Sequence, residues 1–242
     1  MRPPFCRIGS KRDIADKLIA LFPEHEIYVE PFIGSGAVYW RKTPSKKEVI
    51  NDLDSELINN YKLLKSTKSR NFRTDLDSVP KIRRFEKEPH TSEADKLIWG
   101  IINGCNRFMG IPTSKLYNDS NPFSKLKNID EYQERLKNTS IYNQSYEKII
   151  SKYDSPNTFF YLDPPYENSK GLYKHPEFDF EKFRDVLSKT KGKWLMSIND
   201  SKYIRDVFKQ FKIKPLIVKA KSASNSVGSK DRKELLIANY DI

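Results

Sequence analysis

An acid, two prolines and a tyrosine in a row, Asp163-Pro164-Pro165-Tyr166, form the stretch of this sequence best suited to chemistry. They follow the apolar, strand-favouring run 159–162, so the sequence predicts a buried strand that ends in a rigid turn. Neither proline can donate a backbone hydrogen bond, which leaves the carbonyls of Asp163 and Pro164 as acceptors beside a carboxylate. With the Tyr166 ring next to them, these acceptors suit a planar ligand that donates hydrogen bonds, such as the exocyclic amine of a nucleobase. The alternative is that Asp163 simply begins a proline turn.

A glycine turn after another predicted strand is the next candidate for ligand binding. Residues 27–32 are predicted to form that strand, and residues 33–40 a glycine turn that opens a helix. Gly34 and Gly36 allow the backbone to approach a ligand where a side chain would collide with it. The acid at the end of the strand, Glu30, suits a cationic or hydroxyl-bearing small molecule better than a phosphate. The third glycine of the dinucleotide-binding fingerprint is missing, so the turn alone does not predict a dinucleotide.

A further strand, predicted over residues 49–54, ends in acids about 20 residues after the glycine turn, where a doubly wound sheet places the carboxylate that binds ribose. Asp52 is the candidate for that role. The alternative is that Asp52 or Asp54 caps the helix predicted over residues 55–64. The glycine turn and Asp52 together favour a nucleoside-binding half of an α/β sheet.

Periodic apolar residues predict the elements that hold these motifs in place. Apolar runs predict strands over 139–146, 194–199, 213–218 and 234–240. Helical spacing predicts helices over 13–22, where Ser10 is the candidate N-cap, and over 94–102, 147–152, 179–187 and 202–211. Residues 103–123 are predicted to form an irregular loop. The alternation of strands and helices indicates an α/β fold.

The chain carries a large excess of positive charge. Its 242 residues include 44 Lys and Arg against 32 Asp and Glu, a net charge of +12. Such an excess favours a polyanionic partner, and nucleic acid is the first candidate because phosphate neutralisation dominates that kind of binding. Residues 62–87 alone hold nine basic and three acidic side chains, although a solvated helix face is an alternative reading of them. The predicted loop over 103–123 and a basic, Ser-rich loop over 219–230 add residue types that contact bases and phosphates. The candidate DNA-binding residues are Lys81, Arg83, Arg84, Asn106, Arg107, Phe108, Lys115, Asn121, Lys221, Ser224, Asn225 and Lys230.

Other classes of protein are disfavoured by the sequence. No apolar run approaches the roughly 20 residues that cross a bilayer. Arg7, Lys11 and Arg12 interrupt any signal-peptide core. Cys6 and Cys105 form no disulfide framework, and the three histidines are not spaced as metal ligands. We therefore expect no metal, no membrane partner, and a location in the cytoplasm or wherever the target nucleic acid resides.

In this order the motifs resemble those of the Dam-type (alpha-group) site-specific DNA adenine-N6 methyltransferases. The resemblance implies a Rossmann-like, S-adenosylmethionine-dependent methyltransferase sheet with helices on both faces. Residues 1–64 and 139–242 are then expected to form the catalytic domain, and residues 65–138 a mainly helical, inserted DNA-recognition domain. The resemblance covers nearly the whole chain, through Gly9-Ser10-Lys11, the run from Glu30 to Val38, Asn51-Asp52, Asp163-Pro164-Pro165-Tyr166, residues 197–200 and the loop 224–233.

The resemblance also implies a reaction and the residues that serve it. S-adenosylmethionine is the expected methyl donor, and the acceptor is the N6 amine of an adenine flipped out of double-stranded DNA at a short target site. A cognate restriction endonuclease is a further candidate partner, and the protein is expected to be a monomer or a weak dimer. The expected catalytic residues are Asp163, Pro164, Pro165 and Tyr166. The expected cofactor-binding residues are Arg7, Gly9, Lys11, Glu30, Pro31, Phe32, Gly34, Ser35, Gly36, Asp52, Leu53, Ser145, Tyr146 and Asp163.

The residue types support this chemistry independently. The Asp163 carboxylate and the Pro164 carbonyl could grip both hydrogens of an adenine amine and stabilise the positive charge that develops on its nitrogen. A cytosine C5 methyltransferase needs a cysteine nucleophile in a proline-cysteine turn, and neither cysteine has that context. Two alternatives stay open: methylation of RNA or of a protein amide, and a catalytically silent DNA-binding relative. The acid before the prolines and the basic insertion favour DNA, and the intact Asp163, Gly34 and Gly36 favour an enzyme.

Overall fold

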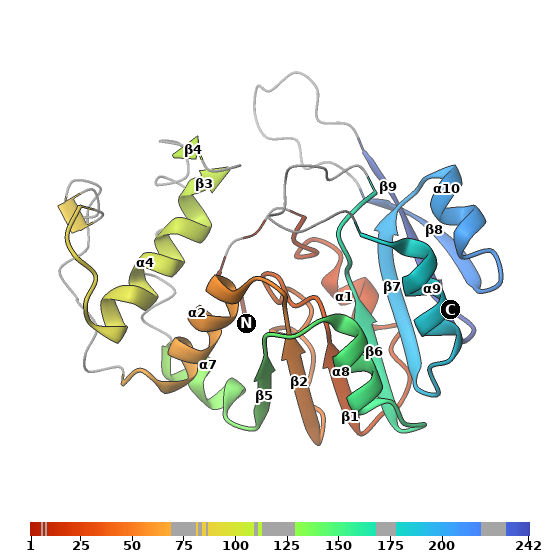
Figure 1. Cartoon of the computed structure of the whole chain (residues 1–242), viewed down its shortest axis with the longest axis horizontal. Coiled ribbons are helices and arrows are strands. Elements are labelled where there is room, and N and C mark those ends of the chain that lie inside the picture. Colours follow the sequence, from red (N-terminus) through yellow and green to blue (C-terminus); the bar gives the residue numbers. More distant parts are fainter. Residues whose placement is uncertain are drawn as a thin grey trace.

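A mixed, seven-stranded sheet forms the centre of the molecule (Figure 1). The computed structural model describes residues 1–5, 7, 9–68, 81, 84–85, 87–108, 111–112, 129–167, 178–218 and 231–242; of residues 102–108 and 111–112 it describes the backbone alone. The strand order is β5-β2-β1-β6-β7-β9-β8. The strands are β1 (Ile27–Glu30), β2 (Lys47–Asn51), β5 (Thr139–Tyr142), β6 (Thr158–Leu162), β7 (Lys193–Asn199), β8 (Lys212–Val218) and β9 (Arg232–Ala238).

The order of the strands reverses between β1 and β6. The chain starts at β1 and moves outward through β2 and β5, then returns to the other side of β1 with β6 and continues to β7. These five strands are parallel, whereas β9 runs antiparallel to both β7 and β8. In open sheets of this kind, ligands bind outside the carboxyl ends of the strands at such a reversal. Glu30 is the last residue of β1 and Asp163 directly follows β6, so both acids lie at the carboxyl ends of the two strands that flank the reversal.

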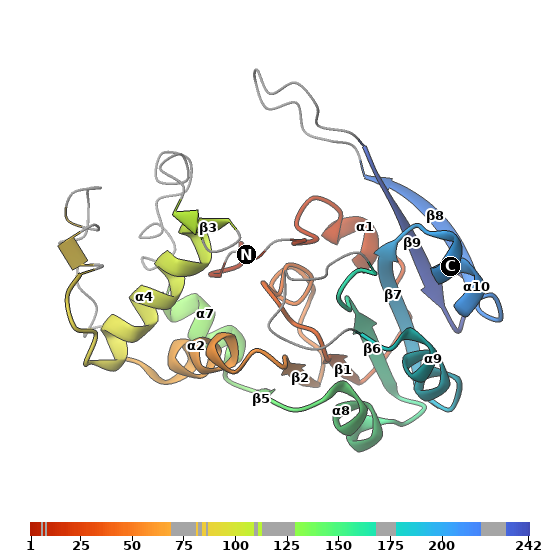
Figure 2. The same ribbon diagram turned by 45° about the horizontal axis from the view of Figure 1, so that its top comes forward.

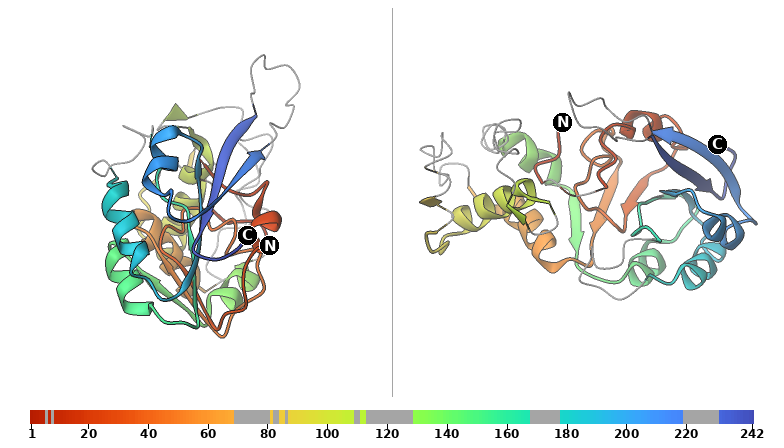
Figure 3. Two further views of the ribbon diagram at one scale, coloured as in Figure 1. Left: turned by 90° about the vertical axis from the view of Figure 1, so that its right-hand side faces the viewer. Right: turned by 90° about the horizontal axis from the view of Figure 1, so that it is seen from above.

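Helices cover both faces of the sheet, and each face has its own hydrophobic core (Figure 3). Helices α8 (Tyr146–Tyr153), α9 (Phe180–Ser188) and α10 (Lys202–Val207) lie on one face, and α1 (Ala15–Ile19) and α2 (Ser55–Ser66) on the other. Strand β6 is buried along its whole length because both of its faces are covered, which explains its continuous apolar sequence. The sheet is therefore Rossmann-like, as expected.

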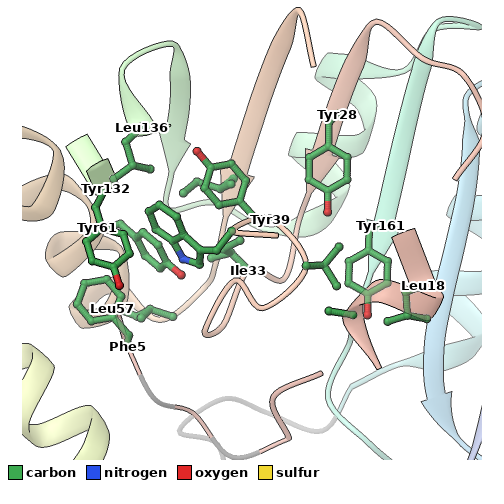
Figure 4. Close-up of a cluster of buried hydrophobic side chains, with 14 of the residues drawn as sticks. Phe5, Leu18, Tyr28, Ile33, Tyr39, Leu57, Tyr61, Tyr132, Leu136 and Tyr161 are labelled. Carbon is green, nitrogen blue, oxygen red and sulfur yellow. The ribbon is translucent and has the colours of Figure 1, made fainter. Parts of the chain in front are cut away.

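The core on the α1 and α2 face is rich in aromatic side chains (Figure 4). Tyr61 of α2 stacks on Trp40 with an interplanar angle of 11°, and Phe5 meets Tyr61 edge to face. Tyr28 and Tyr161 come from the neighbouring strands β1 and β6 and are both fully buried. This core lies directly beneath the glycine turn, so it fixes the position of that turn.

A helical excursion extends from the end of α2 (Figure 2). It contains α4 (Glu93–Asn106), the short strands β3 (Arg107–Phe108) and β4 (Ile111–Pro112), and α7 (Ile129–Leu136). Both α4 and α7 pack against α2, and Gln133 of α7 donates a hydrogen bond to the Leu64 carbonyl at 3.1 Å. Helix α7 is absent from the sequence predictions, although Ile129, Tyr132 and Leu136 recur at helical spacing and are buried.

Two predicted helices differ from the structure. Residues 33–40 form a series of turns, because Gly34 and Gly36 adopt positive φ angles of 46° and 69° and interrupt helical geometry. The first helix, predicted over 13–22, spans only Ala15–Ile19. Ser10 does not cap it: the N-cap residue is Ile14, and the Ser10 hydroxyl is hydrogen-bonded to that of Ser35 at 2.9 Å.

Further boundaries also differ, and the short strands β3 and β4 lie within residues 103–123, where the sequence predicts an irregular loop. Helix α4 continues to Asn106, where the sequence predicts a loop from residue 103. Helix α10 ends at Val207, short of the predicted 211. Strand β5 ends at Tyr142 because Asn143 and Gln144 bond to the end of β2: the Gln144 amide donates to Asn51 Oδ1 at 2.9 Å. Of the helices in the described ranges, none has the length and apolar character needed to cross a membrane.

Candidate active site at the carboxyl ends of the strands

Lys11 and Asp163 form a partly buried ion pair at the end of β6. The Lys11 Nζ lies 2.7 Å from Asp163 Oδ1 and 2.9 Å from the Tyr166 hydroxyl. Lys11 is 3% exposed as a residue, whereas 23% of the Asp163 side chain remains exposed. The structure therefore brings together Lys11, which sequence reasoning assigned to the cofactor, and the two reactive side chains of the proline turn.

The electrostatics of the pair follow from burial and proximity. Burial alone would lower the pKa of Lys11, but the charge of Asp163 and the nearby Tyr166 and Glu234 raise it, so Lys11 stays protonated. Burial raises the pKa of Asp163, against the opposing charge of Lys11. Lys11 thus holds a carboxylate that would otherwise be harder to ionise in this environment.

Tyr166 connects this pair to Glu234, the third residue of β9. The Tyr166 hydroxyl donates to Glu234 Oε1 at 3.0 Å. Glu234 is not among the site residues that the sequence predicts, because it contacts the proline turn from 68 positions away along the chain. The available signal was an acid in front of the apolar run 235–238, which is fully covered in the sheet.

The glycine turn after β1 is held by the end of β2. Asp52 Oδ2 accepts a hydrogen bond from the Gly34 amide at 3.0 Å, and the Tyr61 hydroxyl donates to the Gly34 carbonyl at 3.0 Å. A Cβ added at Gly34 would meet no atom within 4 Å, whereas one at Gly36 would lie 2.9 Å from Trp40 Nε1 and from the Tyr61 hydroxyl. The turn is thus packed on one side at Gly36 and open at Gly34.

The two acids after β2 have different roles in the structure. Asp54 is the N-cap of α2: its Oδ1 accepts from the Leu57 amide at 3.0 Å. Its other oxygen pairs with Arg7 at 2.6 Å, so this predicted cofactor-binding arginine contacts an acid next to the glycine turn. Asp52 does not cap the helix; its Oδ1 accepts from the Asp54 amide. Of the two possibilities for Asp52 and Asp54, capping falls to Asp54.

Glu30 ends β1 and is buried. Its Oε2 accepts a hydrogen bond from the Tyr28 hydroxyl at 2.7 Å. Burial raises the pKa of the Glu30 carboxyl well above its usual value, and the charge of Asp163 adds to that effect. Pro31 follows, and its carbonyl accepts from Asn51 Nδ2 at 2.9 Å, which ties the end of β1 to the end of β2.

The remaining predicted cofactor-binding residues surround the turn. Phe32 and Tyr146 pack together with a centroid distance of 5.6 Å, in a cluster that includes Phe183. Ser145 precedes Tyr146 as the N-cap residue of α8. Leu53, next to Asp52, leaves 48% of its surface exposed. Gly9 adopts a φ of 81° and its carbonyl accepts from Lys11 Nζ at 3.4 Å.

Few of the candidate DNA-binding residues fall where side chains are described. Lys81 and Arg84 are exposed, and Arg84 forms a 3.7 Å pair with Glu88. Asn106 ends α4, and Arg107 and Phe108 form β3. The positions outside the described residues are Arg83, Lys115, Asn121, Lys221, Ser224, Asn225 and Lys230.

Comparison with known proteins agrees with this arrangement. Residues 8–94 and 112–221 match the family described as D12 class N6 adenine-specific DNA methyltransferase. A type II methyltransferase of Lactococcus lactis subsp. cremoris is 27% identical, over 98% of this chain and 95% of the relative. A type II methyltransferase of the Paramecium bursaria Chlorella virus NC1A is 24% identical, over 86% of each chain. The DNA adenine methylase of Escherichia coli K12 is 22% identical, over 96% of this chain and 92% of the relative.

The matched ranges include the glycine turn and the proline turn, together with strands β1 and β6, which precede them. With the site geometry described above, the match settles the identity: the chain belongs to the D12 class of N6 adenine-specific DNA methyltransferases.

Proposed function

We propose that Asp163, Pro164, Pro165 and Tyr166 hold the target adenine, and that the glycine turn holds S-adenosylmethionine as the methyl donor. The observation that carries this proposal is the position of Asp163 at the end of β6, next to β1, whose own end leads into Gly34 and Gly36. Two ligands bound at these neighbouring strand ends lie side by side, which is the requirement for direct transfer between them.

The residues around the glycine turn fit S-adenosylmethionine. Gly34 offers open space where a Cβ would point, so a ligand can approach the backbone there. The exposed Leu53 side chain gives an apolar surface for the adenine ring, beside Asp52, whose carboxylate can accept from ribose hydroxyls. Asp163, which Lys11 holds as a carboxylate, would attract the cationic part of the bound cofactor, and Glu30 would offer it hydrogen-bond acceptors. When bound, this cofactor supplies a methyl group already activated on a sulfonium.

The proline turn would bind and activate the methyl acceptor, the amine of the adenine. An adenine amine is a poor nucleophile because its lone pair is delocalised into the ring. The Asp163 carboxylate and the Pro164 carbonyl can accept hydrogen bonds from its two N–H groups, bias the nitrogen toward tetrahedral geometry, and stabilise the positive charge that forms during attack. The N–C bond would form as the C–S bond of the sulfonium breaks, the thioether would leave as the neutral product, and the methylated nitrogen would lose one proton to water. Since the base is unreachable inside a duplex, it must be flipped out, and the Tyr166 ring offers a stacking surface for it.

We further propose that residues 65–138 form the DNA-recognition domain, with residues 1–64 and 139–242 as the catalytic domain. The local excess of basic residues over 62–87 and the packing of α4 on α2, outside the seven-stranded sheet, support this division. Double-stranded DNA with a short adenine-bearing site is the partner. A cognate restriction endonuclease is a second candidate partner, because relatives in Lactococcus and in a Chlorella virus are type II methyltransferases.

Incubation of plasmid DNA with methyl-labelled S-adenosylmethionine, followed by nucleoside analysis, tests the proposal. We expect label in N6-methyladenine with the wild type and none with Asp163→Ala, which should still bind the cofactor. Asp206→Ala, which removes an exposed lysine–aspartate pair of 2.6 Å on α10, is the matched control and should stay active. Label in RNA or protein and not in DNA would contradict the substrate. Activity of Asp163→Ala within about tenfold of wild type would contradict the role of Asp163.

A further inference from the structure

Glu234 is a buried acid that the proposed chemistry does not yet use. It is 1% exposed. It lies on β9, which runs between β7 and β8, and it is paired with Asn199 of β7 and Leu216 of β8. Its Oε1 accepts from the Tyr166 hydroxyl at 3.0 Å. Its Oε2 is buried and has no hydrogen-bond partner among the residues that the structure describes. A buried carboxylate oxygen without a donor is costly, so a functional reason is expected for it.

The direction of each hydrogen bond in the site can be derived. A lysine ammonium has donors only, so at 2.9 Å Lys11 must donate to the oxygen of Tyr166. The hydrogen of the Tyr166 hydroxyl is then available for Glu234, whose carboxylate only accepts. Asp163, Lys11, Tyr166 and Glu234 therefore form one chain of groups, with an acid at each end and the single ammonium beside Asp163.

When the adenine binds, its amine and the Lys11 ammonium compete for the negative charge of Asp163. The amine of the base needs the Asp163 carboxylate as an acceptor, and Lys11 already donates to its Oδ1. A carboxylate can accept from both donors through its two oxygens, but the two then share one negative charge, so the bound amine weakens the attraction of Asp163 for Lys11. A buried ammonium that loses its anion without a replacement is strongly destabilised. Glu234 is the second acid whose charge acts on Lys11, and only the Tyr166 hydroxyl stands between the two in the bonded chain.

We propose that Glu234 is a positioning residue that receives the Lys11 ammonium when the adenine amine takes its place on Asp163. This inference rests on the proposed function of Asp163. The buried Oε2 is the acceptor for that transfer, and the Tyr166 hydroxyl lies along the path. No covalent bond changes: Lys11 exchanges one carboxylate partner for another and keeps its protons. By taking over Lys11, Glu234 makes Asp163 available to the substrate.

Two substitutions at Glu234 separate charge from shape. Glu234→Gln keeps the length of the side chain and an oxygen for Tyr166, but it has no negative charge to receive Lys11. Glu234→Asp keeps the charge and loses reach. We expect single-turnover methylation to fall about tenfold or more in Glu234→Gln and less in Glu234→Asp, with cofactor affinity within about twofold of wild type in both. A purely structural role predicts the reverse order, because Gln preserves the contact with Tyr166.

Glu181→Gln is the matched control. Glu181 accepts from the Tyr203 hydroxyl at 2.6 Å, so it forms the same kind of tyrosine–glutamate pair on the surface of α9 and α10. It should methylate DNA at the wild-type rate, and the thermal unfolding midpoint of each variant shows whether it is folded. Glu234→Gln within about threefold of wild type, or more active than Glu234→Asp, overturns the inference.

A second measurement does not depend on methyl transfer. 2-Aminopurine next to the target adenine, whose position is found by sequencing the wild-type product, reports extrusion of that adenine, because its fluorescence rises when it loses its stacking neighbour. Glu234→Gln should reduce this signal in the wild-type background and have no further effect in Lys11→Met, since Lys11 is then absent. Equal reductions in both backgrounds contradict the inference. If Asp163→Ala stays active, the proposed function fails instead; if it is inactive and Glu234→Gln is unaffected, only this inference fails.

Discussion

The ammonium of Lys11 lies 2.7 Å from the carboxylate of Asp163, although 152 residues separate them in the sequence. The pair joins the segment before α1 to the end of β6, and so it couples the start of the chain to the proline turn. Because both groups are largely enclosed, each one affects the protonation of the other.

Replacement of Lys11 by Met should move the acidic limb of the pH–activity profile to higher pH. Burial raises the pKa of Asp163, and Lys11 opposes that shift, so its removal leaves the carboxyl still harder to ionise. At a given acidic pH a smaller fraction of Asp163 is then the carboxylate that accepts the amine. The pH dependence of kcat/KM, which reports on the free enzyme, measures the effect. Lys202→Met removes an exposed lysine of an aspartate pair and should leave the limb in place; an unmoved limb in Lys11→Met contradicts the coupling.

Asp52→Ala should weaken cofactor binding by about tenfold or more. It should reduce the free energy of unfolding by less than Asp54→Ala does. The Asp52 carboxylate holds the Gly34 amide, so its loss releases the glycine turn in addition to removing the proposed ribose acceptor. Titration calorimetry with S-adenosylmethionine gives the affinity. Asp54→Ala is the informative comparison, because Asp54 caps α2. It should lose about 1 kcal/mol of unfolding free energy. A normal cofactor affinity in Asp52→Ala would remove the role proposed for it.

Alanine at the two glycines should give different results. At Gly36 the new methyl lies 2.9 Å from rigid aromatic groups at a φ of 69°, so Gly36→Ala should lose about 2 kcal/mol or more of unfolding free energy. At Gly34 the methyl meets no protein atom, so Gly34→Ala should lose only about 1 kcal/mol for its positive φ. Its cofactor affinity should fall, because the methyl enters the space proposed for the ligand. Equal stability losses with unchanged affinity would contradict this view of the turn.

Glu48→Gln should destabilise the fold strongly. Glu48 is buried between Lys42, at 2.6 Å, and Arg135 of α7, so its loss leaves two enclosed cations without their anion. The expected cost is about 3 to 5 kcal/mol. Burial would raise the pKa of Glu48, but the hydrogen bond from Arg135 and the charge of Lys42 outweigh it and lower the pKa. Its contribution is therefore present above the unfolded-state pKa and lost as pH falls through the lower folded-state pKa. Urea unfolding of both proteins from pH 7 down to pH 3 checks the size and the sign.

Charge reversal at Lys81 and Arg84 should weaken DNA binding and flatten its salt dependence. Each phosphate contact that is lost reduces the slope of log affinity against log salt by about 1. Lys189→Glu with Lys209→Glu changes the net charge equally on exposed positions near α9 and α10 and serves as the control. Affinities measured across a series of salt concentrations give both slopes. A slope that is the same in the two double variants would exclude the segment from the DNA contact.

Most strands of the seven-stranded sheet were predictable from the sequence because they are apolar runs that end at a turn residue or an acid. Thr158–Leu162 is the clearest case, since a strand covered on both faces has no polar alternation to confuse its assignment. The short strands β3 and β4 were not predicted, because they lie in the range 103–123 that the sequence indicates as a loop. The turns over 33–40 were not predictable, because the apolar spacing after the glycines is helical while the positive φ of Gly34 and Gly36 is not. Helix α7 was missed because its three buried residues lie among charged ones.

The sequence was sufficient to predict which residues belong to the site, but not which of them contact one another. Lys11, Asp52 and Asp163 each stand in a recognisable motif, but the motifs do not say that Lys11 donates to Asp163 or that Asp52 holds Gly34. Such pairings depend on how distant segments meet at the edge of the sheet. Glu234 shows the limit most clearly, because it stands in an ordinary strand sequence and gains its place only through Tyr166.

The excursion that contains α4 departs from α2 and rejoins the sheet through α7, and these two helices touch: Gln133 bonds to the Leu64 carbonyl. The two ends of the excursion, at α2 and α7, are therefore in direct contact. We expect a segment of different length or sequence between these two helices to leave the register of the strands unchanged, provided that the contact between α2 and α7 is kept. On the proposed division of the chain, we expect a replacement of this one segment by that of a relative to exchange the target preference while the catalytic domain is left as it is.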